Sequence, residues 1–196
     1  MKRIVDVLAA TLGLVLLLPL LLLVALLIKL DSVGPVLFCQ ERIGRGWRPF
    51  RMYKFRTMVS DAQHTGTLIT IGHDARITRV GRLLRKTKID ELPQLLNIVK
   101  GEMSLVGPRP EVRRYVELFR QDYEEILRLS PGLTDFASLK YRNEAELLGQ
   151  AVNPEEAYVH HILPEKIVLA KQYIQQSSLK VDLQIILKTL WSISQR

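Results

Sequence analysis

The stretch VLAATLGLVLLLPLLLLVALLI, residues 7–28, decides the architecture of this chain. Twelve of its 22 residues are leucine, and none carries a charge. A helix of this length extends ~33 Å at about 1.5 Å per residue, which matches a bilayer core ~30 Å thick. We therefore expect a membrane-embedded helix in residues 1–31. This pattern excludes a freely soluble protein, a polytopic membrane protein and a disordered chain.

Pro19 lies near the middle of this hydrophobic stretch, and basic residues lie on both sides of it. Proline removes a backbone donor and clashes with the preceding turn, so it kinks a helix. Lys2 and Arg3 precede the stretch and Lys29 follows it, so the charges show no inside–outside asymmetry. A helix that enters one leaflet, bends at Pro19 and returns to the same face explains both features. The residues alone leave this re-entrant form and a straight span equally open.

The rest of the chain has an ordinary globular composition with an excess of basic residues. The formal net charge is +8, and the single cysteine, Cys39, excludes an intrachain disulfide framework. A basic surface beside a membrane helix suits anionic lipid headgroups and phosphate-bearing ligands. No nucleic-acid-binding motif accompanies the basic residues, so we expect no nucleic-acid partner.

Residues 32–196 predict a helix-rich α/β domain. Alternating segments at Val36–Ile43 and Phe50–Met58 predict a short β-hairpin, and residues 61–73 predict a loop. The predicted helices cover residues 76–88, 93–100 and 111–129, and three more begin near Pro154, Pro164 and Ser178. The last of these, rich in Leu and Ile, suits either a bilayer interface as an amphipathic helix or the protein core.

The helix of residues 93–100 can be placed closely. Pro93 belongs in a first turn, where its missing N–H costs nothing, and Gly101 supplies a C-terminal stop. Its predicted buried stripe consists of Leu92, Leu95, Leu96 and Val99. Asp90 and Glu91 therefore lie at or just before the helix N-terminus.

Basic residues lead directly into this carboxylate pair; they are Arg76, Arg79, Arg82, Arg85, Lys86 and Lys88. One interpretation is a solvated basic helix face capped by acids that suit the helix dipole. The other is a phosphate site, because guanidinium groups and a helix N-terminus both bind phosphates. Asp90 and Glu91 would then bind Mg²⁺, or an ionised Asp90 would attack phosphorus. Likewise, Arg109 is either an ordinary surface residue or an arginine pre-ordered by the rigid Gly107–Pro110 segment.

Six motifs, in their order and spacing along the chain, resemble those of a known protein family. They are KRxxD at 2–6, GPVLFxQxRxG at 34–44, FxMYKFRTM at 50–58, DELPQLxNxxxGxMSxVGPRP at 90–110, PGLT at 131–134 and RN at 142–143. The chain resembles the small monotopic phosphoglycosyl transferases, bacterial sugar transferases that begin polysaccharide and glycoprotein assembly, along nearly its whole length. Such enzymes transfer a phosphosugar from a UDP-sugar to polyprenol (undecaprenyl) phosphate and release UMP.

The resemblance implies roles for individual residues. Asp90 would form a covalent phosphosugar intermediate, Glu91 would assist, and Mg²⁺ would bind at Asp90 and perhaps Glu91. Lys54, Arg85 and Arg109 would bind substrate. Residues 1–31 would form the re-entrant helix–break–helix, and residues 32–196 a catalytic domain on the cytoplasmic face of the bacterial inner membrane. A homodimer is compatible with this reading.

The sequence departs from the family pattern in two places. Leu18 precedes Pro19 where family members often have Ser, which leaves the geometry of the bend open. Asp135 replaces the usual Gly after the PGLT motif, and Ser138 and Tyr141 occupy positions usually held by Gln and Gly. We expect sugar selection in this region. Two rival functions use the same residues, namely a membrane-anchored Mg²⁺-dependent phosphohydrolase and a non-catalytic scaffold for anionic lipid.

Overall fold

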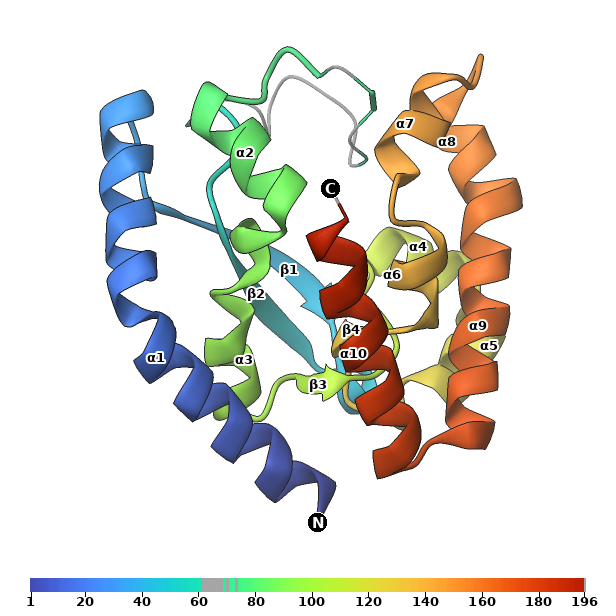
Figure 1. Cartoon of the computed structure of the whole chain (residues 1–196). Helices are drawn as coiled ribbons and strands as arrows, with labels where there is room; N and C mark the ends of the chain where they lie inside the picture. The colour runs from blue at the N-terminus through green and yellow to red at the C-terminus, as the bar shows by residue number, and fades with distance from the viewer. Residues whose placement is uncertain (61–68, 70, 73, 196) are drawn as a thin grey trace.

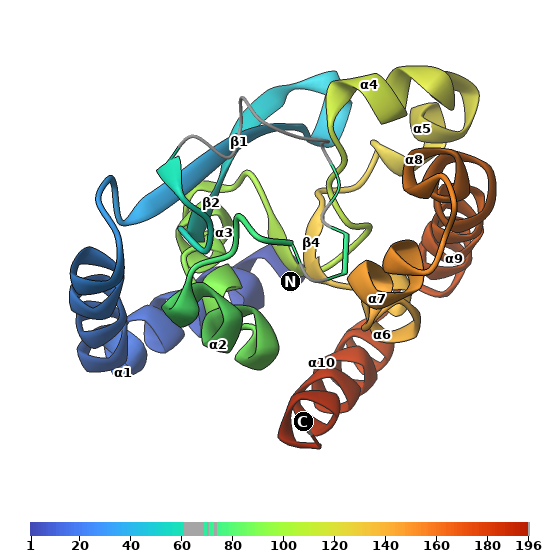
Figure 2. The same ribbon diagram turned by 90° about the horizontal axis from the view of Figure 1, so that it is seen from above.

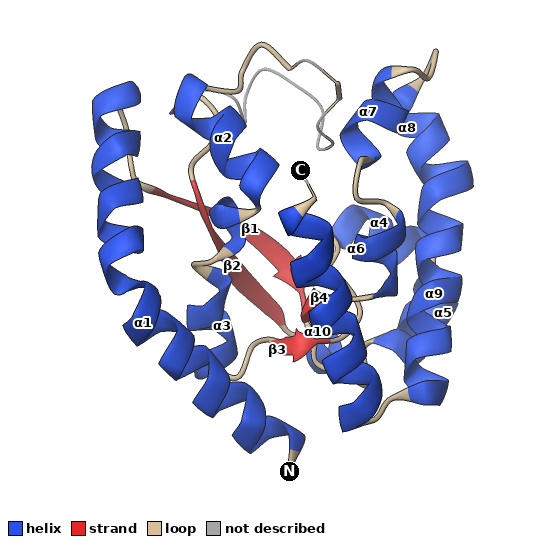
Figure 3. Cartoon of the chain, in the orientation of Figure 1, coloured by secondary structure: helices blue, strands red, loops and turns tan. Residues whose placement is uncertain are grey.

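The computed structural model describes residues 1–60, 69, 71–72 and 74–195, so most of the predicted loop 61–73 lies outside the described residues. Helices surround two small sheets (Figure 3). The longest helix, α1 (Lys2–Asp31), continues without interruption through Pro19 and changes direction part-way along its length (Figures 1 and 2). Within the described part of the chain, α1 is the one helix long and apolar enough to cross a membrane. Its topology in a bilayer stays a prediction.

Most of the α1 surface faces away from the rest of the protein. Large hydrophobic side chains are exposed along its whole length, and only four of its residues are buried: Asp6, Ala10, Val24 and Ile28. Asp6 accepts a hydrogen bond from Ser104 Oγ at 2.7 Å. Arg3 donates to the carbonyl of Ile98 at 2.6 Å, where the negative end of a second helix dipole lies. The N-terminal end of α1 is thus tied to the globular part of the chain by polar contacts.

The predicted hairpin is confirmed. Strand β1 (Leu37–Ile43) pairs antiparallel with β2 (Pro49–Phe55), and a 3₁₀ turn at Arg45–Trp47 joins them. Strand β2 ends before the predicted Met58, because the chain turns inward and buries Arg56 and Thr57. The hairpin lies beside α1 and the helices that follow it in sequence (Figure 2).

Helices α2 (Arg79–Thr87) and α3 (Gln94–Lys100) flank a 3₁₀ turn at Ile89–Glu91. Thr78 caps α2 by accepting a hydrogen bond from the Gly81 N–H at 3.0 Å. Gly81 is required here, because a Cβ at this position would lie 2.1 Å from the Thr57 carbonyl oxygen. The predicted stop at Gly101 is confirmed, with φ of 91° in the left-handed region.

The predicted apolar stripe of α3 is partly wrong. Leu95 is buried, but Leu96 and Val99 are exposed, and Asn97 is fully buried instead. Asn97 faces the edge of β2, where its side chain accepts from the Tyr53 N–H at 3.0 Å and donates to the Arg51 carbonyl at 2.7 Å. A buried strand edge needs hydrogen-bond partners, and this need sets the rotation of α3.

A second sheet was not predicted. Strand β3 (Ser104–Val106) pairs in parallel with β4 (Gly132–Thr134). The single helix expected over residues 111–129 is wrong. It divides into α4 (Arg113–Leu118) and α5 (Arg120–Ile126), because Phe119 leaves the helical region at φ −117° and ψ 40°.

The C-terminal part is helical, as predicted. It contains α6 (Phe136–Lys140), α7 (Glu144–Gly149), α8 (Pro154–Ala157), a π-helical turn at Tyr158–Ile162, α9 (Leu163–Gln176) and α10 (Leu179–Ser194). The starts predicted near Pro154, Pro164 and Ser178 are confirmed. Helix α10 buries Ile185 and exposes several large apolar side chains, namely Leu179, Leu183, Leu187, Leu190 and Trp191. Whether this exposed face meets a bilayer stays a prediction.

Candidate active site

A cleft of about 2130 Å³ gathers all five residues to which the sequence assigned a chemical role. These residues are Lys54, Arg85, Asp90, Glu91 and Arg109. They come from β2, α2, the 3₁₀ turn before α3 and the loop after β3. Side chains from α6, α7 and α10 line the cleft as well. The candidate site is therefore assembled from segments far apart in sequence.

Asp90 lies in the 3₁₀ turn between α2 and α3, and it is 7% exposed. Its Oδ1 atom is buried and has no hydrogen-bond partner among the described residues. Burial and the charge of Glu91 together raise the pKa of Asp90 above its ordinary value. The sequence allows an ionised Asp90 beside the basic residues and the helix N-terminus, which would lower its pKa. The pKa is raised instead, because the effect of burial outweighs that of the nearby cations.

Glu91 is held between two cations. Its Oε1 atom lies 2.7 Å from Lys54 Nζ and 2.6 Å from Arg109 Nη2. Burial alone would raise the pKa of Glu91, but the neighbouring charges, Arg109 and then Lys54, hold the pKa well below its ordinary value. The pKa values of the two neighbouring carboxylates are thus shifted in opposite directions, a pattern typical of catalytic sites.

Two further residues lie beside the carboxylates, Thr57 of the FxMYKFRTM motif and Lys88 of the basic series, and the sequence assigned neither a role of its own. Thr57 is buried and accepts a hydrogen bond from Arg85 Nε at 2.8 Å, which orients the guanidinium. Lys88 joins α2 to the 3₁₀ turn with a left-handed backbone, φ 58°. Burial lowers the pKa of Lys88, and it lines the same cleft. A lysine in a left-handed conformation carries a small strain cost.

The Gly107–Pro110 loop places Arg109 as predicted, but a distant residue fixes the loop. Asp135 Oδ2 accepts a hydrogen bond from the Arg109 N–H at 3.2 Å, while Oδ1 caps α6 through the Ser138 N–H at 2.7 Å. A glycine at position 135 could make neither bond. Ser138 and Tyr141, placed near sugar selection by the sequence, both line the cleft. Sugar selection itself stays a prediction.

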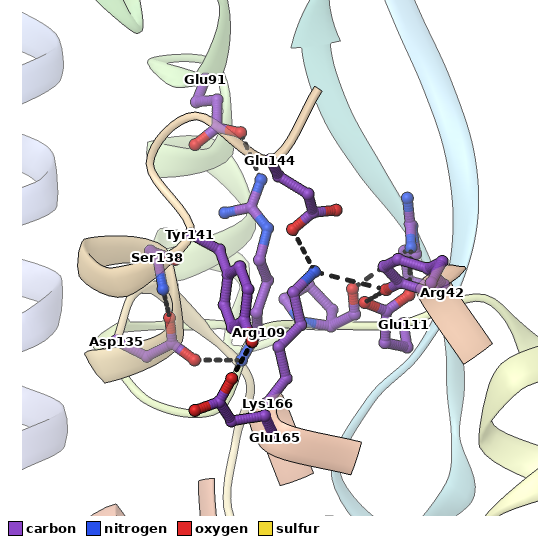
Figure 4. A network of polar contacts seen from close by, with 12 residues as sticks. Arg42, Glu91, Arg109, Glu111, Asp135, Ser138, Tyr141, Glu144, Glu165 and Lys166 are labelled. Atoms are coloured by element: carbon purple, nitrogen blue, oxygen red, sulfur yellow. Dashed lines mark hydrogen bonds and ion pairs between the residues drawn. The ribbon is translucent and has the colours of Figure 1, made fainter. Parts of the chain in front are cut away.

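Behind Arg109 lies a buried polar network that the sequence did not reveal (Figure 4). Glu111 accepts hydrogen bonds from Tyr158 Oη at 2.6 Å and Arg42 Nη1 at 3.2 Å. Lys166 lies 2.5 Å from Glu144. A small cavity of about 80 Å³ lies among these side chains and Arg109. The network comes from β1, the loop between β3 and α4, α7, the π-helical turn and α9, so no local pattern predicted it.

The donor set at Asp90 suits Mg²⁺. No group of three or more His, Cys, Asp or Glu residues that could hold a metal occurs in the described ranges. Asp90 nevertheless offers a buried, unpartnered carboxylate oxygen, and Glu91 adjoins it. Mg²⁺ commonly takes one or two carboxylates and completes its shell with substrate phosphates and water. These residues therefore fit an ion delivered together with a diphosphate.

A family model described as "Bacterial sugar transferase" matches residues 1–196, the entire chain. The chain belongs to the bacterial sugar transferase family. This finding confirms the resemblance drawn from the DELPQL and GPRP motifs. The region of this chain that the family model matches includes the carboxylates and cations of the cleft.

Characterised relatives are similar along nearly the full length of this chain. A UDP-N-acetylgalactosamine-undecaprenyl-phosphate N-acetylgalactosaminephosphotransferase of Aeromonas hydrophila is 41% identical over 98% of this chain. An undecaprenyl-phosphate glucose phosphotransferase of Komagataeibacter xylinus is 42% identical over 96%. The match covers 43% of the first relative and 35% of the second, so this chain spans less than half of either. A UDP-glucose:undecaprenyl-phosphate glucose-1-phosphate transferase of Caulobacter vibrioides is 42% identical over 98% of this chain and 69% of its own length.

Proposed function

We propose that this protein transfers a phosphosugar from a UDP-sugar to undecaprenyl phosphate, giving undecaprenyl-diphosphate-sugar and UMP. This reaction is the first membrane step in assembling a bacterial exopolysaccharide or related glycoconjugate. The observation that carries the proposal is the buried Asp90 carboxylate, whose Oδ1 atom has no hydrogen-bond partner among the described residues, in a cleft whose other charged groups are mostly basic. The names of the relatives supply the two substrates.

The reaction proceeds in two displacements at phosphorus. Asp90 attacks the β-phosphorus of the donor, an Asp90–phosphorus bond forms, the bond to the bridging oxygen breaks and UMP leaves. A phosphate oxygen of undecaprenyl phosphate then attacks the same phosphorus and releases Asp90. Negative charge builds on the phosphoryl oxygens in each transition state, and fixed cations stabilise it. Arg109, Lys54 and Arg85 supply those cations from the cleft wall.

Mg²⁺ at Asp90 would neutralise part of the diphosphate charge and favour the ionised carboxylate. Glu91 does not compete with Asp90 for phosphorus, because both cations that contact its Oε1 hold it in place. Its charge in turn keeps Arg109 and Lys54 aligned beside Asp90. The roles of nucleophile and positioning residue therefore fall to different carboxylates.

The same proposal assigns α1 to membrane attachment. Its apolar surface is exposed, and its N-terminal end is tied to the domain through Arg3, Asp6 and an ion pair between Lys2 and Asp182. A re-entrant α1, bent near Pro19, would hold the cleft at the cytoplasmic face of the inner membrane. There the cleft would meet the phosphate of the lipid acceptor.

Two reactions of the purified protein, with three possible outcomes, separate this proposal from its rivals. The protein in detergent is incubated with Mg²⁺ and a panel of UDP-sugars, with and without undecaprenyl phosphate. Multiple turnovers of UMP release that require the lipid support the transferase. Multiple turnovers without lipid indicate the phosphohydrolase, and no UMP release with any donor indicates the scaffold.

A further inference from the structure

Glu144 stands at the start of α7, and its side chain lines the cleft that holds Asp90 and Arg109. Lys166 Nζ, from α9, lies 2.5 Å from Glu144 Oε2. Lys166 is itself buried, with its ammonium 3.4 Å from Tyr158 Oη and 4.8 Å from the centre of the Tyr158 ring. The Glu144 carboxylate is thus fixed from behind by a buried cation (Figure 4).

The second oxygen of this carboxylate is available to a ligand. Among the described residues, none donates a hydrogen bond to Glu144 Oε1, and the side chain is 28% exposed. Glu144 also lines the small cavity beside Arg109, so it lies next to the arginine assigned to the donor phosphates. A ligand whose phosphates reach Arg109 therefore passes close to this oxygen.

The charge of Glu144 restricts what part of a ligand it contacts. A carboxylate repels phosphate, so the diphosphate stays with the basic side of the cleft. An ionised carboxylate is an acceptor only, and its uncharged partners are O–H and N–H groups. Hydroxyl-bearing rings satisfy this requirement. Tyr141, whose hydroxyl is held by Glu165, offers an aromatic ring in the same cleft for such a ring to lie against.

We infer that Glu144, oriented by Lys166, determines donor specificity by accepting a hydrogen bond from a hydroxyl or amide N–H of an uncharged ring of the donor. This inference rests on the proposed function, which supplies the nucleotide-sugar donor. The proposed contact is to one of the two hydroxyl-bearing rings of that donor, the sugar or the ribose; the uracil N3–H is common to every UDP-sugar, so a contact to it would lower kcat/KM equally for every donor. Lys166 is a positioning residue, because it acts through Glu144.

The test compares kcat/KM for several donors in the full-length protein. The donors are UDP-glucose, UDP-galactose, UDP-N-acetylglucosamine, UDP-N-acetylgalactosamine and the 2′-deoxyribose analogue of the best of these. The variants are Glu144→Ala, Glu144→Gln and the matched control Glu156→Gln, which changes an exposed glutamate of α8 that does not line the cleft. Ratios of kcat/KM between donors, taken in one preparation, do not depend on the fraction of folded protein.

A hydrogen bond to a charged group is worth about a 10- to 100-fold change in an equilibrium. We expect Glu144→Ala to lower kcat/KM for the preferred donor by about this factor, and to leave the donor that lacks the contacted group within about threefold. Loss of discrimination between sugar epimers assigns the contact to the sugar. A lower kcat/KM for the donors that contain ribose, with no change for the 2′-deoxyribose analogue, assigns the contact to the ribose. Glu156→Gln should keep the wild-type ratios.

An equal loss with every donor, the deoxyribose analogue included, would overturn the inference, as would unchanged kcat/KM ratios. Either result leaves the proposed function standing, because the wild-type protein still turns over its donor. A wild-type protein that turns over no donor would instead overturn the proposed function and this inference with it. Lys166→Met should reproduce the altered donor ratios, while Lys171→Met, which changes a partly exposed lysine of α9 that pairs with Asp122 of α5, should not.

Discussion

Asp90 and Glu91 are neighbours in the chain, yet their surroundings move their pKa values in opposite directions. Burial and the neighbouring charge of Glu91 raise the pKa of Asp90. Burial acts on Glu91 too, but the charges of Arg109 and Lys54 outweigh it, so the pKa of Glu91 falls. We propose accordingly that Asp90 reacts and that Glu91 aligns the two cations.

The raised pKa of Asp90 predicts the acid side of the pH–rate profile. Asp90 attacks as a carboxylate, so the rate falls as pH decreases through its pKa. Because that pKa is raised, kcat/KM for the donor at low Mg²⁺ should begin to fall well above the ordinary aspartate pKa of about 3.9. The measurement is initial UMP release across pH, with circular dichroism as a control for folding. A rate that stays constant down to pH ~4 would contradict the assignment.

Glu91 predicts a pH-dependent contribution to stability. Its folded pKa lies below the unfolded value of about 4.3, so its stabilising effect is present above that pH and is lost as pH falls through the folded pKa. We expect Glu91→Gln to lower the free energy of unfolding by about 1–3 kcal/mol at pH 7, since two cations lose their partner. Denaturant unfolding in detergent should show this difference shrinking below pH ~4. A difference that does not change with pH would argue against the ion pairs.

The sequence predicted which residues gather at the site better than it predicted the contacts that support them. All five residues assigned from the motifs lie in one cleft, namely Lys54, Arg85, Asp90, Glu91 and Arg109. The residues around them are Thr57, Lys88, Asp135, Glu144 and Lys166. Some of these belong to the motifs and series noted in the sequence, but their contacts join distant segments, so tertiary structure was needed to show them.

At the scale of elements, α3 shows how a strand edge overrides an apolar pattern. The leucine spacing predicted that Leu96 and Val99 would be buried, but Asn97 takes the buried position and bonds to the backbone of β2. This contact fixes the 3₁₀ turn carrying Asp90 relative to the strand carrying Lys54. The boundaries of α3 were predictable from Pro93 and Gly101. The rotation of α3 about its axis depended on the position of the β2 backbone, which the local sequence of α3 does not encode.

The α3–β2 contact predicts a stability effect. Asn97→Leu removes three hydrogen bonds, one of them to Glu102, and leaves the Tyr53 N–H and the Arg51 carbonyl without their partner. Leaving buried polar groups unsatisfied costs about 1–3 kcal/mol each, so we expect a loss of at least about 2 kcal/mol in the free energy of unfolding. The matched control is Leu96→Ala, on the exposed face, which should change it by less than about 0.5 kcal/mol. Equal effects of the two changes would contradict this account of α3.

At the scale of the whole molecule, polar contacts connect α1 to the part of the chain that forms the cleft. The helix is tied by its N-terminal end to β3 and α3, while its apolar side chains stay exposed. Composition alone identified residues 7–28 as a candidate membrane segment, because an uncharged apolar run of 22 residues is typical of membrane helices. The parallel pair β3–β4 could not be predicted, because its strands are three residues long and 25 residues of other structure separate them.

The re-entrant topology predicts which side of the membrane each end of α1 occupies. In a protein with Cys39→Ser, single cysteines inserted after Met1 or substituted at Ser32 should both label from the cytoplasmic side with a membrane-impermeant maleimide. Inverted and right-side-out vesicles provide the comparison. Labelling of the two positions from opposite sides would show that α1 spans the membrane.

The most direct test of the central claim is the mass of the protein after reaction with its UDP-sugar donor and Mg²⁺ in the absence of undecaprenyl phosphate. We predict that intact-protein mass spectrometry shows one added sugar phosphate, that peptide mapping places it on Asp90, and that adding the lipid removes it. Asp90→Asn should show neither the added mass nor turnover, while Glu156→Gln, outside the cleft, should show both. Lipid-dependent turnover by Asp90→Asn at the wild-type rate, or a sugar phosphate mapped to another residue, would contradict the account.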